Sequence, residues 1–213
     1  MNTLRARALA IGKRAAIGLW PIVVVACGSV ELPRERYFRL EPPPIAPADP
    51  QRAGVLRVMD LQLGTAIDRD CLLVARGMEL EPRPLDRWVA PLDRLVTDAL
   101  VLSLSRTRSV SLVKGGADPG GETWTLHGRI VDFAEVQADG ERTARVGLEL
   151  WLESRDRVLL AEEFHAVQPI AEPGPEAAVA ALSVGVQKVV TELVDRMNRD
   201  GVFAAARPPQ PGR

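Results

Sequence analysis

Three long runs of strand-forming sequence between residues 122 and 168 limit the chain to a small set of folds. They read "ETWTLHGRIVDFAEVQ", "ERTARVGLELWLES" and "RVLLAEEFHAVQ", and compact turn signals at residues 138–140 and 155–156 separate them. Polar and apolar residues alternate in the middle run, as expected of a strand with one packed face. Its apolar positions are Val146, Leu148, Leu150 and Leu152. The region therefore predicts an antiparallel meander that packs through one face.

Shorter strands are predicted on both sides of this meander. Residues 37–40, 54–63, 71–75 and 77–81 precede it in the chain, and residues 109–114 come just before it. The stretch "EPRPLDRWVAP" is predicted as a corner, because proline lacks the N–H group that a strand interior needs. A second proline-rich stretch, "EPPPIAPADP", is predicted as an extended connector.

Two amphipathic helices are predicted. The first begins at Pro91, where a first-turn proline is tolerated, and continues for about four turns. The second begins at Pro175 and ends near Asn198, and its apolar stripe is broad enough to lie flat on a sheet. This order of elements predicts a single α+β domain, a mainly antiparallel sheet with the two helices packed on one face.

The first 26 residues have the features of an export signal. They include four basic residues and no acidic ones, and residues 15–26 form an apolar run. The run has 12 residues, whereas a helix that crosses a bilayer needs about 20. It ends in Val-Val-Ala and is followed by Cys27 and Gly28; a buried structural cysteine is the alternative at this position. We predict a lipoprotein signal peptide at residues 1–26 rather than a permanent membrane span.

The residues around Cys27 resemble a bacterial lipobox. The resemblance implies that the Cys27 thiol takes a diacylglyceryl group, that cleavage follows Ala26, and that the new amine is acylated with a chain such as palmitate. Two or more acyl chains hold a protein stably at a membrane. Gly28 stands where inner-membrane retention signals carry Asp, which favours the outer membrane. The covalent lipid on Cys27 is the only cofactor predicted.

Removal of the signal peptide leaves 187 residues, enough for one domain of ordinary size. We predict a lipidated tether at residues 27–36, a folded domain at residues 37–202 and a disordered tail at residues 203–213. Without the four basic residues of the leader, 23 basic and 28 acidic residues remain, a net charge of −5. This acidic balance argues against nucleic acid as a partner.

The mature sequence contains no recognisable catalytic or metal-binding motif. His127 and His165 fall in predicted strands without spaced Cys, Asp or Glu around them. "KGGADPGG" lacks the spacing of a phosphate-binding loop, and there is no G-x-S-x-G elbow. Glu162 and Glu163 are neighbours in a strand, so their side chains should point to opposite faces. We predict no enzyme activity and no metal, and we interpret Cys71, the only other cysteine, as a packed thiol.

The whole chain resembles the ABC-type transport auxiliary lipoproteins, a PqiC-like family of outer-membrane lipoproteins. The features that match are the lipobox cysteine, "RYFRLEP", "LRVMDLQL", the late helix and the segment "RGMELEPRPLDRWVAPLDRLVTDALVLSL". Within that segment the strongest match is Arg87-Trp88-Val89-Ala90-Pro91, an Arg-Trp pair and a small residue before the proline that opens the first helix. The chain departs from its relatives at residues 80–87, which contain no aromatic residue.

The resemblance implies a lipoprotein at the periplasmic face of the outer membrane that works with an MCE-type transporter of lipids or solutes. Expected partners are a periplasmic MCE-family protein, which it would dock at the outer membrane, and the ABC permease and ATPase. Ring-like homo-oligomers occur in the family, so self-association is a further expectation. Tyr37, Arg87 and Trp88 are the candidate interaction residues, although Tyr37, Trp88 and Trp151 could instead be core aromatics. Two other functions stay open: a structural outer-membrane lipoprotein of another envelope machine, and a periplasmic hydrolase with a cryptic site.

Overall fold

A computed structural model describes residues 33–47, 52–155 and 157–199, all of them in one compact unit. The predicted signal peptide, the lipidation site Cys27 and the predicted tail at residues 203–213 lie outside the described residues. In order along the chain the elements are β1 (Arg36–Phe38), β2 (Arg52–Val58), β3 (Gln62–Leu63), β4 (Cys71–Arg76), β5 (Glu79–Trp88), α1 (Leu92–Thr107), β6 (Val110–Gly115), β7 (Trp124–Ala138), β8 (Glu141–Ser154), β9 (Arg157–Pro169) and α2 (Pro175–Arg199). The predicted α+β class is confirmed.

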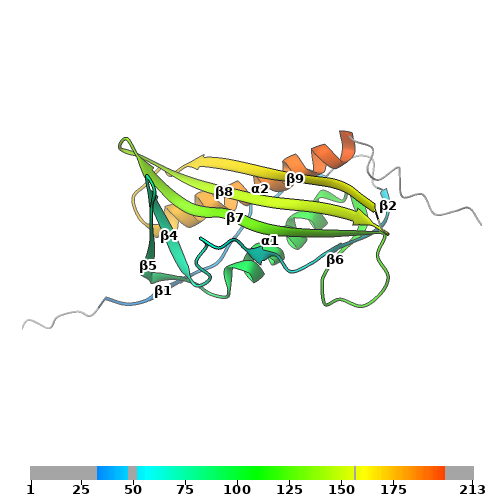
Figure 1. Cartoon of the computed structure of the whole chain (residues 1–213), viewed down its shortest axis with the longest axis horizontal. Coiled ribbons are helices and arrows are strands. Elements are labelled where there is room, and N and C mark those ends of the chain that lie inside the picture. The colour runs from blue at the N-terminus through cyan, green and yellow to red at the C-terminus, as the bar shows by residue number, and fades with distance from the viewer. Residues whose placement is uncertain (1–32, 48–51, 156, 200–213) are drawn as a thin grey trace, which may run out of the picture. The chain divides into compact units, whose positions relative to one another are not determined.

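β7 organises the sheet, because it pairs along both of its edges. One edge pairs with β8 in antiparallel fashion from Thr125 to Ala138, and β8 pairs in turn with β9. The other edge takes three short parallel strands in succession, β2, β3 and β4. β6 extends the sheet beyond β2, and β5 and β1 extend it beyond β4. The meander is therefore as predicted, and two short branches meet its long hairpin at opposite ends (Figure 1).

The compact turn predicted at residues 138–140 is a two-residue hairpin loop between β7 and β8. Asp139 and Gly140 both have positive φ, 52° and 80°. Two successive positive φ angles match the right-handed twist of the flanking strands, which is why Asp-Gly favours this turn. Most of the paired positions in the sheet belong to antiparallel strands, while the five parallel pairings are short.

Residues 54–63, predicted as one strand, form two. β2 ends at Val58, which pairs with Leu126, and β3 begins at Gln62, which pairs with Arg129, so the register slips by one residue between them. The backbone N–H of Leu61 donates to Thr97 Oγ1 on α1 at 3.0 Å instead of to a strand. Because of this one-residue slip, the Leu61 side chain points into the core. A regular alternation of inward and outward side chains along one strand could not predict this.

The predicted corner at residues 81–91 is wrong, since most of it is strand β5. β5 passes through Pro82 and Pro84 while it pairs with β4. Its other edge is covered by β1 only at Asp86–Trp88. Backbone N–H groups two residues apart point to the same edge of a strand. The N–H groups that Pro82 and Pro84 lack can therefore both belong to the uncovered edge. Proline is tolerated there because no ladder hydrogen bond is lost.

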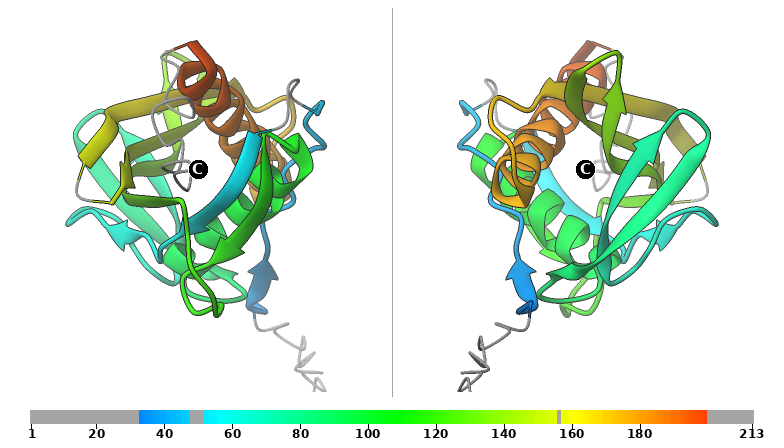
Figure 2. Two further views of the ribbon diagram at one scale, coloured as in Figure 1. Left: turned by 90° about the vertical axis from the view of Figure 1, so that its right-hand side faces the viewer. Right: turned by 90° about the vertical axis from the view of Figure 1, so that its left-hand side faces the viewer.

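Both helices lie against the same face of the sheet, as predicted. The sheet curls around them, which the end-on views make plain (Figure 2). α1 follows Pro91 and ends at Thr107, and the left-handed conformation of Arg108 (φ 52°) caps it. α2 packs on β8, β9 and α1. α2 is long and apolar enough to cross a bilayer, yet its apolar stripe is buried in the domain, which is the arrangement of a core helix.

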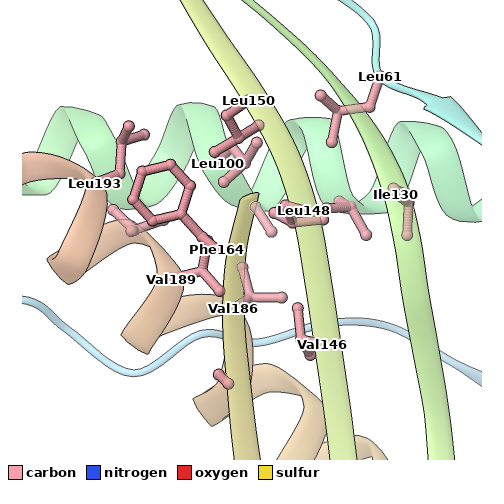
Figure 3. Packing of buried hydrophobic residues seen from close by; sticks show 14 of the residues in the cluster. Leu61, Leu100, Ile130, Val146, Leu148, Leu150, Phe164, Val186, Val189 and Leu193 are labelled. Atoms are coloured by element: carbon pink, nitrogen blue, oxygen red, sulfur yellow. The ribbon is translucent and has the colours of Figure 1, made fainter. Parts of the chain in front are cut away.

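The core lies between the inner face of the meander and the two helices. The four apolar positions of β8 predicted to face inward are fully buried. They pack against side chains of α1 and α2 such as Leu100, Val186, Val189 and Leu193 (Figure 3). Burial of each such side chain contributes roughly 1.5–3 kcal/mol. α2 approaches closely because Gly185 faces Val146, where a Cβ atom would lie only 2.7 Å from Val146 Cγ2.

Candidate functional site

β1 brings the three predicted interaction residues to one place. Tyr37 pairs with Arg87 and Phe38 with Trp88, in parallel register. The backbone N–H of Val89 donates to the carbonyl of Phe38 at 2.8 Å, which continues this contact past the end of β5. Residues fifty positions apart in the sequence thus meet where the chain enters the domain.

The structure separates these residues into core and surface. Trp88 is 5% exposed, and its ring meets Phe133 edge-on with 5.8 Å between the centroids, so the core alternative holds for it. Tyr37 is 59% exposed. Its hydroxyl donates to Glu35 Oε2 at 2.5 Å, and this hydrogen bond raises the pKa of Tyr37. Trp151 is half-buried on β8 and stacks on His127, away from this site.

An exposed apolar surface surrounds Arg87. Leu85 is 40% exposed and Val89 is 59% exposed, and both flank Arg87 in the chain. We call Tyr37, Leu85, Arg87 and Val89 the β1–β5 surface. Of the nine exposed large hydrophobic side chains in residues 33–47, 52–155 and 157–199, five belong to β1, β5 or the residues beside them. They are Tyr37, Met78, Leu80, Leu85 and Val89.

The sequence reasoning missed Met78, Leu80, Leu85 and Val89. Met78 and Leu80 lie in the strand predicted at residues 77–81, which was too short to assign their faces, and Leu85 and Val89 lie in the predicted corner, where the prolines concealed the strand. The family resemblance drew attention to the Arg-Trp pair but carried no information about its apolar neighbours. Only the pairing of β1 with β5 shows that Tyr37 joins them.

A network of charges that runs from buried Glu135 to exposed Arg36 and Glu176 lies beside this surface. It links β8, β7, β5, β1 and α2 in that order. Its ion pairs are Arg142–Glu135 (2.7 Å), Glu135–Arg83 (2.9 Å), Arg83–Asp86 (3.7 Å), Asp86–Arg36 (2.7 Å) and Arg36–Glu176 (3.3 Å). Basic and acidic groups alternate throughout, so each charge has an opposite neighbour. The network ties Arg36, at the start of the domain, to the middle of the sheet.

Glu135 is the most buried member of this network, with 2% of its surface exposed. Burial by itself would raise the pKa of its carboxyl group. Hydrogen bonds from Arg142 and Gln137, together with the charge of Arg83, outweigh burial and lower the pKa below its ordinary value of 4.5. The carboxylate is thus held in its charged form, as expected of a buried acid with several donors.

The residues after β1 continue as an irregular segment across the helices, in agreement with the predicted proline-rich connector. The backbone N–H of Glu41 donates to Ser183 Oγ at 3.0 Å, and Gln187 Nε2 donates to the carbonyl of Pro44 at 3.1 Å. A groove of about 460 Å³ lies between this segment and α2. Phe38 and Val179 are among its lining residues. The chain is therefore fixed to the domain at β1 and again after it.

The described part of the chain brings no catalytic set together. Within it, no three His, Cys, Asp or Glu residues lie close enough to hold a metal ion. Glu162 pairs with Arg196 on α2, whereas Glu163 pairs with His165 at 3.0 Å on its own strand. Cys71 is half-buried, and burial raises the pKa of its thiol, which lowers its reactivity at neutral pH. The arrangement at β1 suits binding rather than chemistry.

Comparison with known proteins shows the family. The model of the ABC-type transport auxiliary lipoprotein component matches residues 38–194, so the chain belongs to this family. Among curated proteins, none matches the chain. The match excludes the first 37 residues and the tail, and it covers β5, α1, the meander and most of α2.

Solved structures with the same fold include proteins from Xanthomonas campestris and Chlamydia trachomatis. Protein XCC0632 from Xanthomonas campestris is 19% identical with a TM-score of 0.70, and the alignment covers 81% of this chain and 99% of that one. An uncharacterized protein is 17% identical with a TM-score of 0.63, covering 77% and 99%. The hypothetical protein CT253 from Chlamydia trachomatis is 11% identical with a TM-score of 0.50, covering 72% and 99%. At these identities the likeness concerns the fold alone.

Replacement of Glu135 by glutamine should destabilise the domain by about 2–3 kcal/mol at pH 7, because Arg83 and Arg142 lose a shared partner. The lowered pKa means that the charged carboxylate stabilises the fold above pH 4.5 and that this stability is lost as the pH falls further. The free energy of unfolding in urea should therefore fall less between pH 7 and pH 4 for Glu135→Gln than for the parent. Glu149→Gln, which breaks an exposed pair with Arg129, is the control and should cost less than about 1 kcal/mol. Equal effects of the two substitutions would contradict this assignment.

Trp88 and Tyr37 should differ in what they contribute to stability. Trp88→Ala opens a cavity beside Phe133 and should cost about 3–5 kcal/mol of unfolding free energy. Tyr37→Ala removes an exposed ring and should change the unfolding free energy by about 0.5 kcal/mol or less. The midpoints of urea unfolding measure both effects. An unchanged midpoint for Trp88→Ala would contradict the assignment of the Trp88 ring to the core.

Proposed function

We propose that this protein is the auxiliary lipoprotein subunit of an MCE-type ABC system that transports lipids or solutes. In this role it is held by the lipid on Cys27 at the periplasmic face of the outer membrane, and it docks the periplasmic MCE component there. The match to the transport auxiliary lipoprotein family carries the proposal. The geometry of β1 supports it, because this strand joins the route to the membrane to an exposed binding surface.

The tether sets how far the domain can move from the lipid. Nine peptide units separate Cys27 from Arg36, a reach of roughly 30 Å when the chain is fully extended. Arg36 is held by Asp86 on β5 and Glu176 on α2. A pull on the tether would therefore act on the sheet and on α2 together. This is a suitable attachment for a subunit that holds a large partner at a membrane.

The β1–β5 surface is the proposed contact with the MCE component. It combines three exposed apolar side chains with Arg87, and tyrosine and arginine are enriched among the residues that dominate binding energy. Trp88 supports this surface from the core instead of touching the partner. A stable interface needs about 1,000 Å² of buried area or more, so neighbouring segments such as Met78–Leu80 would also take part.

The role is one of positioning, and we assign the protein no catalytic step, metal or cofactor apart from its covalent lipid. The ATPase and permease would supply energy and the path through the inner membrane. Ring-like self-association, which the family resemblance implies, stays a prediction for this chain.

The lipid anchor is tested with Cys27→Ser in the full chain. The parent should be cleaved before Cys27, carry the mass of its acyl chains and fractionate with the outer membrane on a sucrose gradient. The variant should keep its leader and show no acyl mass, because serine cannot form the thioether. If parent and variant had the same mass and the same membrane distribution, the anchor would be refuted.

The docking surface is tested by capture of the MCE protein from the same cells on the acylated chain. Tyr37→Ala combined with Leu85→Ala should weaken the affinity about tenfold or more, as expected when residues at the centre of an interface are truncated. Leu112→Ala, which truncates a comparably exposed residue on β6, is the matched control and should bind like the parent. Equal binding by all three proteins would place the interface elsewhere. Capture of another envelope machine and no MCE protein would support the structural outer-membrane alternative.

A further inference from the structure

The outer edge of β9 is the longest uncovered strand edge in the described part of the chain. β9 has 13 residues and pairs with β8, while no described strand pairs with its other side. Between Val158 and Gln168 it contains no proline and no lysine, and Val158 and Val167 are 58% and 56% exposed. The free part of β5, in contrast, is blocked by its two prolines. An edge without such protection readily adds another strand.

A groove of about 520 Å³ runs between this edge and α2. α2 is held beside β9 by Arg196, whose Nε lies 2.9 Å and 3.0 Å from the two carboxylate oxygens of Glu162. The C-terminal half of α2 thus follows the edge of β9 (Figure 1). The lining residues are His165, Ala166, Val167 and Gln168 of β9 and Gln187, Lys188, Thr191, Glu192, Asp195 and Arg199 of α2.

The chain continues from this groove. Arg199 ends α2 and lines the groove, and fourteen residues of the sequence follow it. The first part of them, residues 201–206, reads "GVFAAA" and has neither charge nor proline. Arg207-Pro208-Pro209 comes next, and proline cannot continue a hydrogen-bonded ladder. Six extended residues span about 20 Å, and the small alanine side chains suit a strand enclosed between a sheet edge and a helix.

We propose that residues 201–206 add to the free edge of β9 as a further strand and occupy the groove beside α2. The attachment to α2 favours this segment over a second copy of the chain, because a short flexible connection gives an effective concentration in the millimolar range. The segment would supply N–H and C=O partners to the part of β9 that lines the groove and would cover Val167. It would also prevent two molecules from pairing through their β9 edges. Disorder would then begin at Arg207 rather than at Phe203.

Hydrogen exchange measured by mass spectrometry tests the proposal on the full acylated chain. Amides of residues 165–168, which line the groove, should exchange about tenfold or more slowly in the parent than in a chain that ends at Arg199, because opening of the added strand must precede exchange. Ala204→Pro in the full chain should reproduce the faster exchange, since it removes a donor from the added strand. Gln210→Pro, beyond the proposed strand, is the matched control and should behave like the parent. Amides of β6, which also has a free edge, should be the same in all four proteins.

Two results would overturn the proposal. In the first, β9 exchanges equally fast in the parent, in the truncated chain and in Ala204→Pro. In the second, β9 is protected in the truncated chain and its protection rises with protein concentration, which would show that a second copy covers the edge. Amides of β7 report whether the truncated chain is still folded, and if they too lose protection, the Ala204→Pro and Gln210→Pro pair decides the outcome.

Discussion

The two-sided pairing of β7 is the constraint on which the rest of the structure depends. β8 pairs with one edge over almost its full length, and β2, β3 and β4 share the other. The β2–β6 branch and the β4–β5–β1 branch both join the meander only through this second edge of β7. Close packing is required at Gly128, where a Cβ atom would lie 2.8 Å from the carbonyl oxygen of Glu149 and 2.5 Å from Leu150 Cδ2. β7 therefore holds both the branch that carries the candidate site and the branch that supports α1.

The charge network connects the middle of the sheet to the candidate site at β1. Glu135 lies on β7, and three ion pairs, through Arg83 and Asp86, connect it to Arg36. A buried acid without partners would be costly, but here three donors compensate it, so the network can specify where β1 docks. The same residues fix the end of the tether and the underside of the β1–β5 surface. In the proposed function, attachment to the membrane and presentation of a binding surface would thus depend on one set of contacts.

Regular periodicity explains which parts of the fold could be predicted. The strands of the meander and both helices follow from patterns that repeat over ten or more residues, and the turn between β7 and β8 follows from the Asp139-Gly140 pair. β5 and β3 could not be assigned, because each depends on what lies beside it. Two prolines are acceptable in β5 only where its edge is free, and Leu61 leaves the ladder only because Thr97 accepts its N–H. For the candidate site, the resemblance indicated Tyr37, Arg87 and Trp88, but it could not say which of them is exposed.

The sequence by itself determined the class of the fold, the long antiparallel hairpins and both helices, and it predicts a lipobox around Cys27. These features are local, since a turn, an amphipathic stripe and an export signal each lie within a short segment. Only the tertiary structure decided that β1 pairs with β5, that Trp88 is core while Tyr37 is surface, and that the outer edge of β9 is uncovered. These features depend on contacts between residues far apart in the chain. Burial and edge exposure belong to the assembled sheet, and no single segment carries them.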